Sequence, residues 1–169
     1  ADKARVYEHT QVACIFNTDH VDTLRMVENA DVIEGARAIG FSSTEMPSVS
    51  MLGLAEDILV DRAFLKNRYN EAYELAVLQD LAPAPGKMPA KHTVENALAA
   101  AALCRAADID PKAVGAGLRS FKTGAHRNQL VGYANDIMWV NDSKATNPHA
   151  ANASMSGYPS LVWIAGGLS

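Results

Sequence analysis

The segment from Thr93 to Ala107 strongly constrains the fold of this chain. Its apolar residues recur at helical spacing and predict one buried stripe along a helix: Val94, Ala97, Leu98, Ala101 and Ala102. Alanine is the best helix former, and its small side chain allows a helix to lie close to a sheet. We expect Thr93 to cap the helix and Glu95 to lie in its first turn. The chain should therefore contain a helix packed on a β-sheet.

Short runs rich in β-branched and aromatic residues predict the strands of that sheet. The expected strands are Val12 to Asn17, Asp31 to Glu34, Ala36 to Phe41, Val49 to Leu54 and Ile58 to Ala63. The last two are interpreted as a hairpin, although a helix from Asp61 to Leu65 fits equally well, and Tyr73 to Leu78 fits helix or strand. Val21 to Asn29 has the spacing of a short helix. By composition, Ser42 to Pro47 and Pro83 to Pro89 are loops.

A second helix is expected to start at Asp110 and Pro111, with the aspartate as cap and the proline in the first helical position. The residues expected to face inward are Val114, Leu118 and Phe121. Lys122-Thr123-Gly124-Ala125 interrupts this pattern. We therefore expect two domains, residues 1–123 and 124–169.

The second part is expected to open with a hairpin, Leu130 to Ala134 and Ile137 to Asn141, because Asn135-Asp136 is a typical turn pair. Asn147 and Pro148 then predict the start of a helix that runs to about Ser156. Leu161 to Ala165 is apolar enough for a buried strand. The order strand, helix, strand is one βαβ unit, so the fold class is α/β.

Composition excludes several classes of protein. Apolar residues make up 49% of the 169 residues, which is enough for a packed core. The formal net charge of −4 argues against nucleic acid as a partner, since phosphate binding needs a basic surface. The longest apolar stretch, Ala97 to Cys104, is too short to span a bilayer. Cys14 and Cys104 are typical of buried thiols in a reducing cytoplasm.

The stretch WVNDSKATNPHAA, Trp139 to Ala151, is the main candidate for a functional site. It joins the end of an expected strand to the start of an expected helix, which is where open α/β sheets bind ligands. Lys144 suits a carboxylate or phosphate, and Asp142 can accept from a ribose hydroxyl or bind a cation. A polar loop whose side chains only cap the turn remains the alternative.

Three other positions are weaker candidates when they are taken alone. Arg127, in His126-Arg127, could clamp a phosphate, or the pair could be exposed on a hinge. Asn96 is an unusual residue for the first turn of an Ala-rich helix, so it could read an adenine edge or simply cap. Lys3 has the features of a solvated terminal charge.

Several short signatures nevertheless follow one another in a fixed order. They are Asp2-Lys3-Ala4-Arg5-Val6-Tyr7, Ile15-Phe16-Asn17, His92-x-x-x-Asn96-Ala97-Leu98-Ala99-Ala100, His126-Arg127, Asn141-Asp142-Ser143-Lys144-Ala145-Thr146-Asn147 and Ile164-Ala165-Gly166-Gly167. Together they resemble the Mur ligases of bacterial cell-wall synthesis. The string from Asn141 to Asn147 is most similar to that of the members that add D-glutamate. Thr93 and Asn128-Gln129 depart from the usual pattern, which has Asn after the helix His and an apolar residue and Glu after His-Arg.

The resemblance implies the second half of a central ATPase domain, followed by the opening βαβ of a Rossmann-like C-terminal domain. It implies that Lys3 is a carbamate that binds Mg²⁺, and that Asn96 lies near the adenine of ATP. Arg127, beside His126, would lie near the phosphates and Asp142 near the ribose. Lys144 and Thr146 would then lie on the side of the acceptor amino acid and the acyl phosphate.

The reaction implied is ATP-dependent amide formation between D-glutamate and UDP-N-acetylmuramoyl-L-alanine through an acyl phosphate, catalysed by a cytoplasmic enzyme that is monomeric at full length. The chain contains no G-x-x-x-x-G-K-[ST] phosphate loop. We expect it to be a fragment without ligase activity of its own, although a short natural chain with an edge strand is the alternative. Two other functions stay open: a related amide ligase, of the Mur or folylpolyglutamate synthetase type, and a non-catalytic nucleotide- or peptide-binding module.

Overall fold

The computed structural model describes residues 2–83 and 86–167, which form two compact units that meet in the sequence between Phe121 and Lys122. In the first unit the elements are η1 (Asp2–Tyr7), β1 (Ala13–Asn17), α1 (Val21–Glu28), β2 (Arg37–Phe41), β3 (Met51–Ala55), β4 (Ile58–Asp61), β5 (Tyr73–Val77), η2 (Leu78–Leu81), α2 (Lys91–Ala106) and α3 (Pro111–Ser120). In the second unit they are β6 (Gln129–Ala134), β7 (Ile137–Asn141) and α4 (Pro148–Met155).

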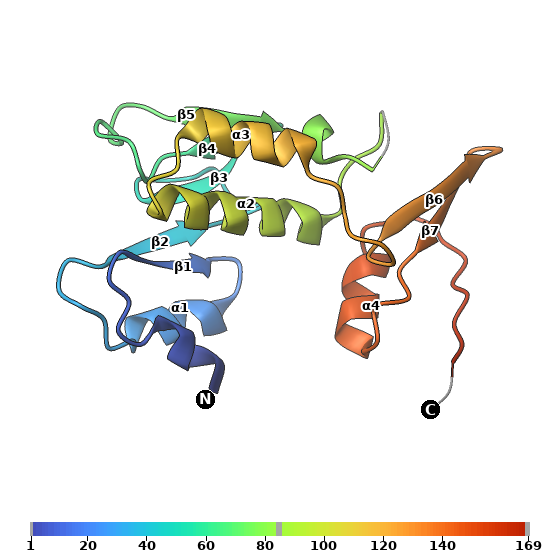
Figure 1. The fold of residues 1–169 in the computed structure, drawn as a ribbon, viewed down its shortest axis with the longest axis horizontal. Helices are drawn as coiled ribbons and strands as arrows, with labels where there is room; N and C mark the ends of the chain where they lie inside the picture. The colour runs from blue at the N-terminus through green and yellow to red at the C-terminus, as the bar shows by residue number, and fades with distance from the viewer. Residues whose placement is uncertain (1, 84–85, 168–169) are drawn as a thin grey trace. The chain divides into compact units, whose positions relative to one another are not determined.

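The first unit is a five-stranded mixed sheet with strand order β1-β2-β3-β4-β5. β1 and β2 pair in parallel, as do β2 and β3, whereas β4 runs antiparallel to β3 and β5. Helices α2 and α3 lie side by side across one face of the sheet (Figure 1). The α/β fold class is thus confirmed for this unit.

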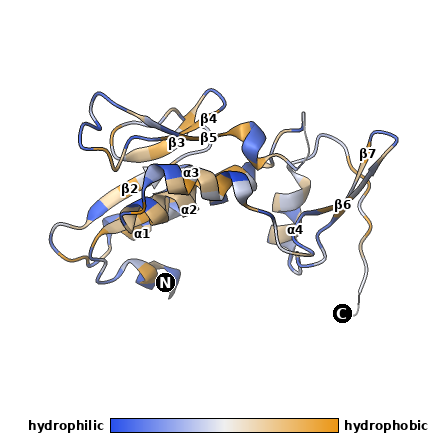
Figure 2. Cartoon of the chain, turned by 45° about the horizontal axis from the view of Figure 1, so that its top comes forward, coloured by the Kyte–Doolittle hydropathy of each residue, from blue (hydrophilic) through white to orange (hydrophobic). Residues whose placement is uncertain are grey.

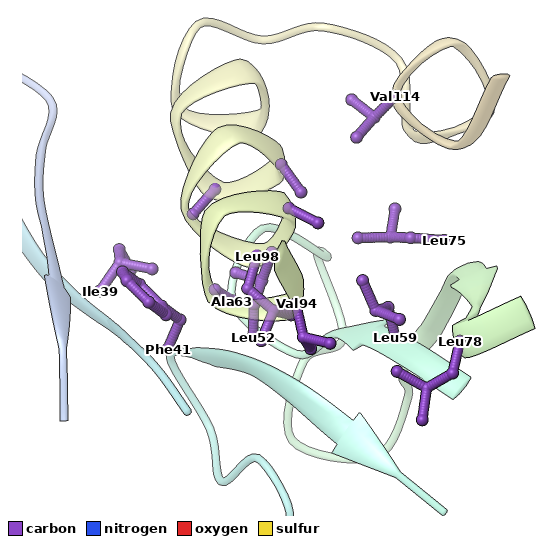
Figure 3. Close-up of a cluster of buried hydrophobic side chains, with 13 residues drawn as sticks. Ile39, Phe41, Leu52, Leu59, Ala63, Leu75, Leu78, Val94, Leu98 and Val114 are labelled. Atoms are coloured by element: carbon purple, nitrogen blue, oxygen red, sulfur yellow. The ribbon is translucent and has the colours of Figure 1, made fainter. Parts of the chain in front are cut away.

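The core lies between α2, α3 and the sheet, where side chains from both layers meet (Figure 3). All five residues of the predicted stripe on α2 are buried. Leu98 packs among Ile39, Leu52 and Leu59, and each of these four side chains is fully buried. Strands β3 and β4 are correspondingly apolar in colour in Figure 2, and the loops that join the elements are largely hydrophilic.

Helix α3 lies close to the sheet because residue 115 has no side chain. A Cβ atom built on Gly115 would lie 2.4 Å from the carbonyl oxygen of Leu75 in β5. Arg119, one turn further along α3, donates a hydrogen bond to that same oxygen at 3.2 Å. Asp110 caps the helix as predicted, since its side chain accepts from the Lys112 N–H at 2.8 Å.

Three local predictions for the first unit are wrong. The backbone is still extended at Ala90, the N-cap, and α2 starts at Lys91, so Thr93 lies inside the first turn. Asp31 to Glu34 forms no strand, because the segment makes single backbone bonds to the loop before β1 and then turns at Gly35. Phe121 is 67% exposed, since the backbone becomes extended there.

Other predictions for this unit are confirmed or decided. Strands β1 and β2, helix α1 and the β3–β4 hairpin form where the sequence predicted them. The ambiguous segment at residues 73–78 becomes β5 followed by η2, and no helix forms at residues 61–65. Of the predicted loop at 83–89, residues 84 and 85 lie outside the described part of the chain.

The second unit contains a hairpin and one helix. β6 and β7 pair antiparallel around Asn135 and Asp136, which both have positive φ values, 52° and 61°, as a tight hairpin turn requires. Asn147 caps α4 by accepting from the Ala150 N–H at 2.9 Å, and Pro148 occupies the first helical position. These predictions are confirmed.

The predicted βαβ unit is wrong, because residues 161–165 form no strand. Val162 is 91% exposed and Ile164 is 83% exposed. A strand requires a hydrogen-bonding neighbour. Among the described residues, β6 and β7 pair only with each other, so this segment has no strand to join.

Candidate functional site

Two sequence motifs of the second unit lie against each other. The first is the loop at 124–128, which contains His126-Arg127, and the second is the loop at 141–147 that joins β7 to α4. The Lys144 N–H donates to the carbonyl oxygen of His126 at 3.0 Å. The Asn128 N–H donates to Asp142 Oδ1 at 2.8 Å. The structure therefore brings together residues that lie 14 or more positions apart in the sequence.

The imidazole of His126 is held by an amide from the second loop. Asn141 Nδ2 lies 2.9 Å from His126 Nδ1. The Ser143 N–H donates to Asn141 Oδ1 at 3.1 Å, which fixes the orientation of that amide. With Nδ1 as the acceptor of this bond, the neutral ring carries its proton on Nε2. This leaves the exposed Nε2–H of His126 as a hydrogen-bond donor.

One carboxylate oxygen of Asp142 accepts a hydrogen bond from within the unit. Oδ1 accepts from Asn128, and the Ala145 N–H donates to the Asp142 carbonyl at 2.9 Å, which closes a turn. Among the described residues none donates a hydrogen bond to Oδ2. A carboxylate held at one oxygen and available at the other is suited to accept from a hydroxyl group of a ligand.

The cationic side chains of these loops are exposed. Among the described residues, the Arg127 guanidinium and the Lys144 ammonium have no hydrogen-bond or ion-pair partner. Both backbones are held, Arg127 through its N–H to Gly124 and Lys144 through His126. Thr146 is also exposed, and its N–H donates to the Lys144 carbonyl. The loops thus present two positive charges from a fixed backbone, an arrangement suited to an anion.

No family model matches the chain. Curated proteins named UDP-N-acetylmuramoylalanine–D-glutamate ligase do match it. The protein from Leifsonia xyli subsp. xyli is 51% identical over 168 residues, which is 99% of this chain and 32% of that protein. The protein from Streptomyces avermitilis is 49% identical over 169 residues, 100% of this chain and 35% of that protein. The protein from Mycolicibacterium smegmatis is 40% identical over 99% of this chain and 31% of its own length.

The chain belongs to the Mur ligase family. It spans about a third of the length of the curated relatives that it matches. The Mur ligase resemblance on which the site residues were chosen is therefore confirmed. The individual roles of those residues stay predictions.

Asn128 and Gln129, which depart from the usual Mur ligase pattern, both have partners in this structure. Asn128 Oδ1 accepts from the Tyr158 hydroxyl at 2.7 Å, and Gln129 Oε1 accepts from the His126 N–H at 2.9 Å. Sequence reasoning missed Tyr158. Asn128 itself has a positive φ of 47°, a conformation that Asn tolerates better than most residues. This preference of Asn for a positive φ was the only feature of the sequence that could have drawn attention to Asn128.

The two site residues predicted in the first unit are exposed. Lys3 lies in the 3-10 helix η1, and Asn96 lies on α2, between the buried positions Val94 and Ala97. Asn96 therefore points away from the core, which leaves its amide available to a ligand. No helix among residues 2–83 and 86–167 has the length and apolar character needed to cross a bilayer.

The described residues do not by themselves form a Mg²⁺ site. They contain no cluster of three or more His, Cys, Asp or Glu side chains that could hold a metal ion. Lys3, as a carbamate, could supply one anionic oxygen ligand, whereas Mg²⁺ requires six oxygen ligands. Further ligands would have to come from the nucleotide, from water or from residues outside this set.

A polar cluster at the carboxyl ends of β1 and β2 was also missed. The Asp19 carboxylate accepts from the hydroxyls of Ser42, Ser43 and Thr44, at 2.6, 3.2 and 2.9 Å. Burial raises the pKa of Asp19, but these hydrogen bonds outweigh it and hold the pKa below its usual value of 3.8. Lys91, at the start of α2, lies 4.0 Å from the same carboxylate. The cluster ties two loops and the start of α2 together.

Proposed function

We propose that this chain supplies nucleotide- and acceptor-binding residues of a cytoplasmic, ATP-dependent ligase that joins D-glutamate to UDP-N-acetylmuramoyl-L-alanine in peptidoglycan synthesis. Support comes from identities of 40–51% over nearly the whole chain to proteins that carry that ligase name. The observation that carries the proposal is the hydrogen-bonded junction of the loops at 124–128 and 141–147. Both cysteines are free thiols, as in proteins of a reducing compartment.

In this reaction the substrate carboxylate attacks the γ-phosphoryl group of ATP, which gives an acyl phosphate and ADP. The amine of D-glutamate then attacks the acyl carbon, and phosphate leaves as the amide forms. Arg127 would bind phosphate oxygens and offset their negative charge. Asp142 Oδ2 would accept from a ribose hydroxyl. Each role uses an atom that has no partner among the described residues.

The remaining residues are proposed to have the roles that the resemblance to Mur ligases implies. Lys144 would offset negative charge on the acceptor amino acid or the acyl phosphate, and Thr146 would donate its hydroxyl nearby. His126 would donate from Nε2 to a phosphate oxygen. Asn96 would bind the adenine through its exposed amide. Lys3 as a carbamate would give Mg²⁺ one oxygen ligand, and the metal would offset phosphate charge when it is bound.

An ADP titration of the isotope-labelled 169-residue chain, followed by NMR, tests the nucleotide roles. We expect amide shifts to concentrate in the two loops of the second unit. Arg127→Ala and Asp142→Asn should each raise the dissociation constant about 10- to 100-fold, the usual effect of losing a hydrogen bond to a charged group. Asp142→Asn keeps an acceptor for the Asn128 N–H, so it tests the ligand contact and not the loop.

Lys122→Ala is the matched control, because it removes an exposed positive charge from the same unit without touching either loop motif. Its effect on ADP affinity should be small. If Lys122→Ala weakens binding as much as Arg127→Ala does, any exposed positive charge of this unit attracts the nucleotide equally, and the assignment of Arg127 fails.

A further inference from the structure

Tyr158 is linked to the candidate site although it belongs to neither sequence motif. It lies just beyond α4, after Ser156 and Gly157, and its side chain is half-buried. Its hydroxyl donates to Asn128 Oδ1 at 2.7 Å, across 30 positions of sequence. This contact joins the segment after α4 to the loop that contains His126-Arg127.

Asn128 connects Tyr158 to Asp142 through two hydrogen bonds. Its side-chain oxygen is occupied by Tyr158, and its backbone N–H donates to Asp142 Oδ1 at 2.8 Å. The positive φ of Asn128 turns the amide toward Asp142. One residue therefore receives a hydrogen bond on one side and gives a hydrogen bond on the other.

We propose that Tyr158 is a positioning residue, which acts through Asn128 to hold the Asp142 carboxylate with Oδ2 directed to a ligand hydroxyl. The nature of that ligand, a nucleotide with a ribose diol, rests on the function proposed above. The positioning itself rests only on the two hydrogen bonds. Tyr158 touches no ligand in this scheme.

The protonation state of Tyr158 agrees with the direction of its hydrogen bond. Burial raises the pKa of Tyr158, and the negative charge of Asp142 raises it further, although the bond to Asn128 has the opposite effect. The phenol therefore keeps its proton at neutral pH. Asn128 Oδ1 can only accept, so the hydroxyl is always the donor in this pair.

Exchange of the Asn128 N–H with solvent, measured by NMR in the 169-residue chain, tests the positioning. Tyr158→Phe removes one oxygen and keeps the ring, and it should raise the exchange rate of that N–H about three- to tenfold, the usual effect of losing a neutral hydrogen bond. Tyr133→Phe is the matched control. Its hydroxyl bonds to Asp136 Oδ1 at 3.1 Å in the same unit, and its loss should leave the Asn128 rate unchanged.

Asn128→Gly completes a mutant cycle, since glycine keeps the backbone N–H and tolerates the positive φ. Tyr158→Phe should have no further effect on the residue-128 N–H in the Asn128→Gly background. If it does have one, or if Tyr158→Phe changes nothing in the original chain, then Tyr158 does not act through Asn128 and the inference is overturned. Exchange rates at other amides check that each variant stays folded.

An ADP titration of the same variants separates this inference from the proposed function. Tyr158→Phe should raise the dissociation constant about threefold or more, and Tyr133→Phe should not change it. If the original chain does not bind ADP, the proposed nucleotide role of Asp142 fails. The exchange result then still decides whether Tyr158 positions the carboxylate. If the original chain does bind ADP, a coupling seen in exchange with no change in ADP affinity in Tyr158→Phe would contradict the inference.

Discussion

Arg105 Nε lies 3.0 Å from Asp61 Oδ2 in an ion pair whose carboxylate is fully buried and whose guanidinium side chain is 9% exposed. Asp61 Oδ1 also accepts from the N–H groups of Ala63 and Phe64, at 2.7 and 3.0 Å. The ion pair therefore fixes α2, the helix that contains Asn96, to the end of β4. A buried pair contributes modestly as a whole, but removing one partner is costly because the other charge stays buried.

We predict that Arg105→Met lowers the free energy of unfolding of the first unit by about 3 kcal/mol. Methionine keeps much of the volume of the side chain but leaves the Asp61 carboxylate without its counter-charge. Urea unfolding followed by far-ultraviolet circular dichroism measures the change, because α2 and α3 contain most of the helix. Arg25→Met, at an exposed position on α1, should shift the free energy by less than about 0.5 kcal/mol. Equal shifts in the two variants would refute a special cost for the buried charge.

The two glycines of α3 should respond to alanine in opposite directions. Gly115→Ala should destabilise the first unit by about 1–3 kcal/mol, because the added Cβ would lie 2.4 Å from the Leu75 carbonyl oxygen and α3 would have to move outward. Nothing lies within 4 Å of a Cβ at Gly117, so Gly117→Ala should stabilise the helix by about 0.5–1 kcal/mol. Melting temperatures of the two variants provide the test. A loss of stability from Gly117→Ala would contradict this view of the helix face.

The polar cluster around Asp19 should make the first unit sensitive to acid. The folded-state pKa of Asp19 is depressed, so its contribution is present above the ordinary value of 3.8 and is lost as the pH falls through the folded-state value. Ser42→Ala removes the buried hydroxyl that donates to Asp19 at 2.6 Å and should cost about 1–2 kcal/mol at pH 7. Urea unfolding at pH 7 and pH 3 should show a smaller cost at pH 3, because below the ordinary value of 3.8 protonation of Asp19 in the unfolded chain starts to offset the contribution of the bond. The same cost at both values would exclude a role for the carboxylate charge.

The 169-residue chain should show no ligase turnover when ATP, Mg²⁺, D-glutamate and UDP-N-acetylmuramoyl-L-alanine are supplied together. The sequence contains no phosphate loop, and the described residues contain no cluster that could hold a metal. A phosphate-release assay measures this, with a full-length relative as the positive control. Release above background that depends on D-glutamate would disprove the prediction.

Local signals predicted much of the fold because neighbouring residues specify it. The stripe on α2, the hairpin turn at Asn135-Asp136 and the Asn147-Pro148 helix start each depend on residues within a few positions. The strand predicted at residues 161–165 failed because a strand also needs a partner, which its own composition does not supply. Thr93 failed as a cap because the backbone already becomes helical at Lys91, and the cap preference of threonine alone does not fix where a helix begins.

The candidate site was predictable in its motifs but not in its connections. His126-Arg127 and the string from Asn141 to Asn147 stood out in the sequence, and the family resemblance linked them. The bond from Tyr158 to Asn128 joins residues 30 positions apart and carries no local pattern, so no reading of short segments could find it. The Asp19 cluster escaped for the same reason, since its hydroxyl donors follow a different strand.

The exposed segment from Leu161 to Ile164 predicts how this chain behaves at high concentration. Four consecutive apolar residues with strong β preference and no charge, Leu-Val-Trp-Ile, are the kind of sequence that pairs with its own copies into aggregates. We therefore expect side chains outside the packed core to limit the solubility of the chain. A single charged residue at Val162, which is 91% exposed, would raise that limit without disturbing any buried contact.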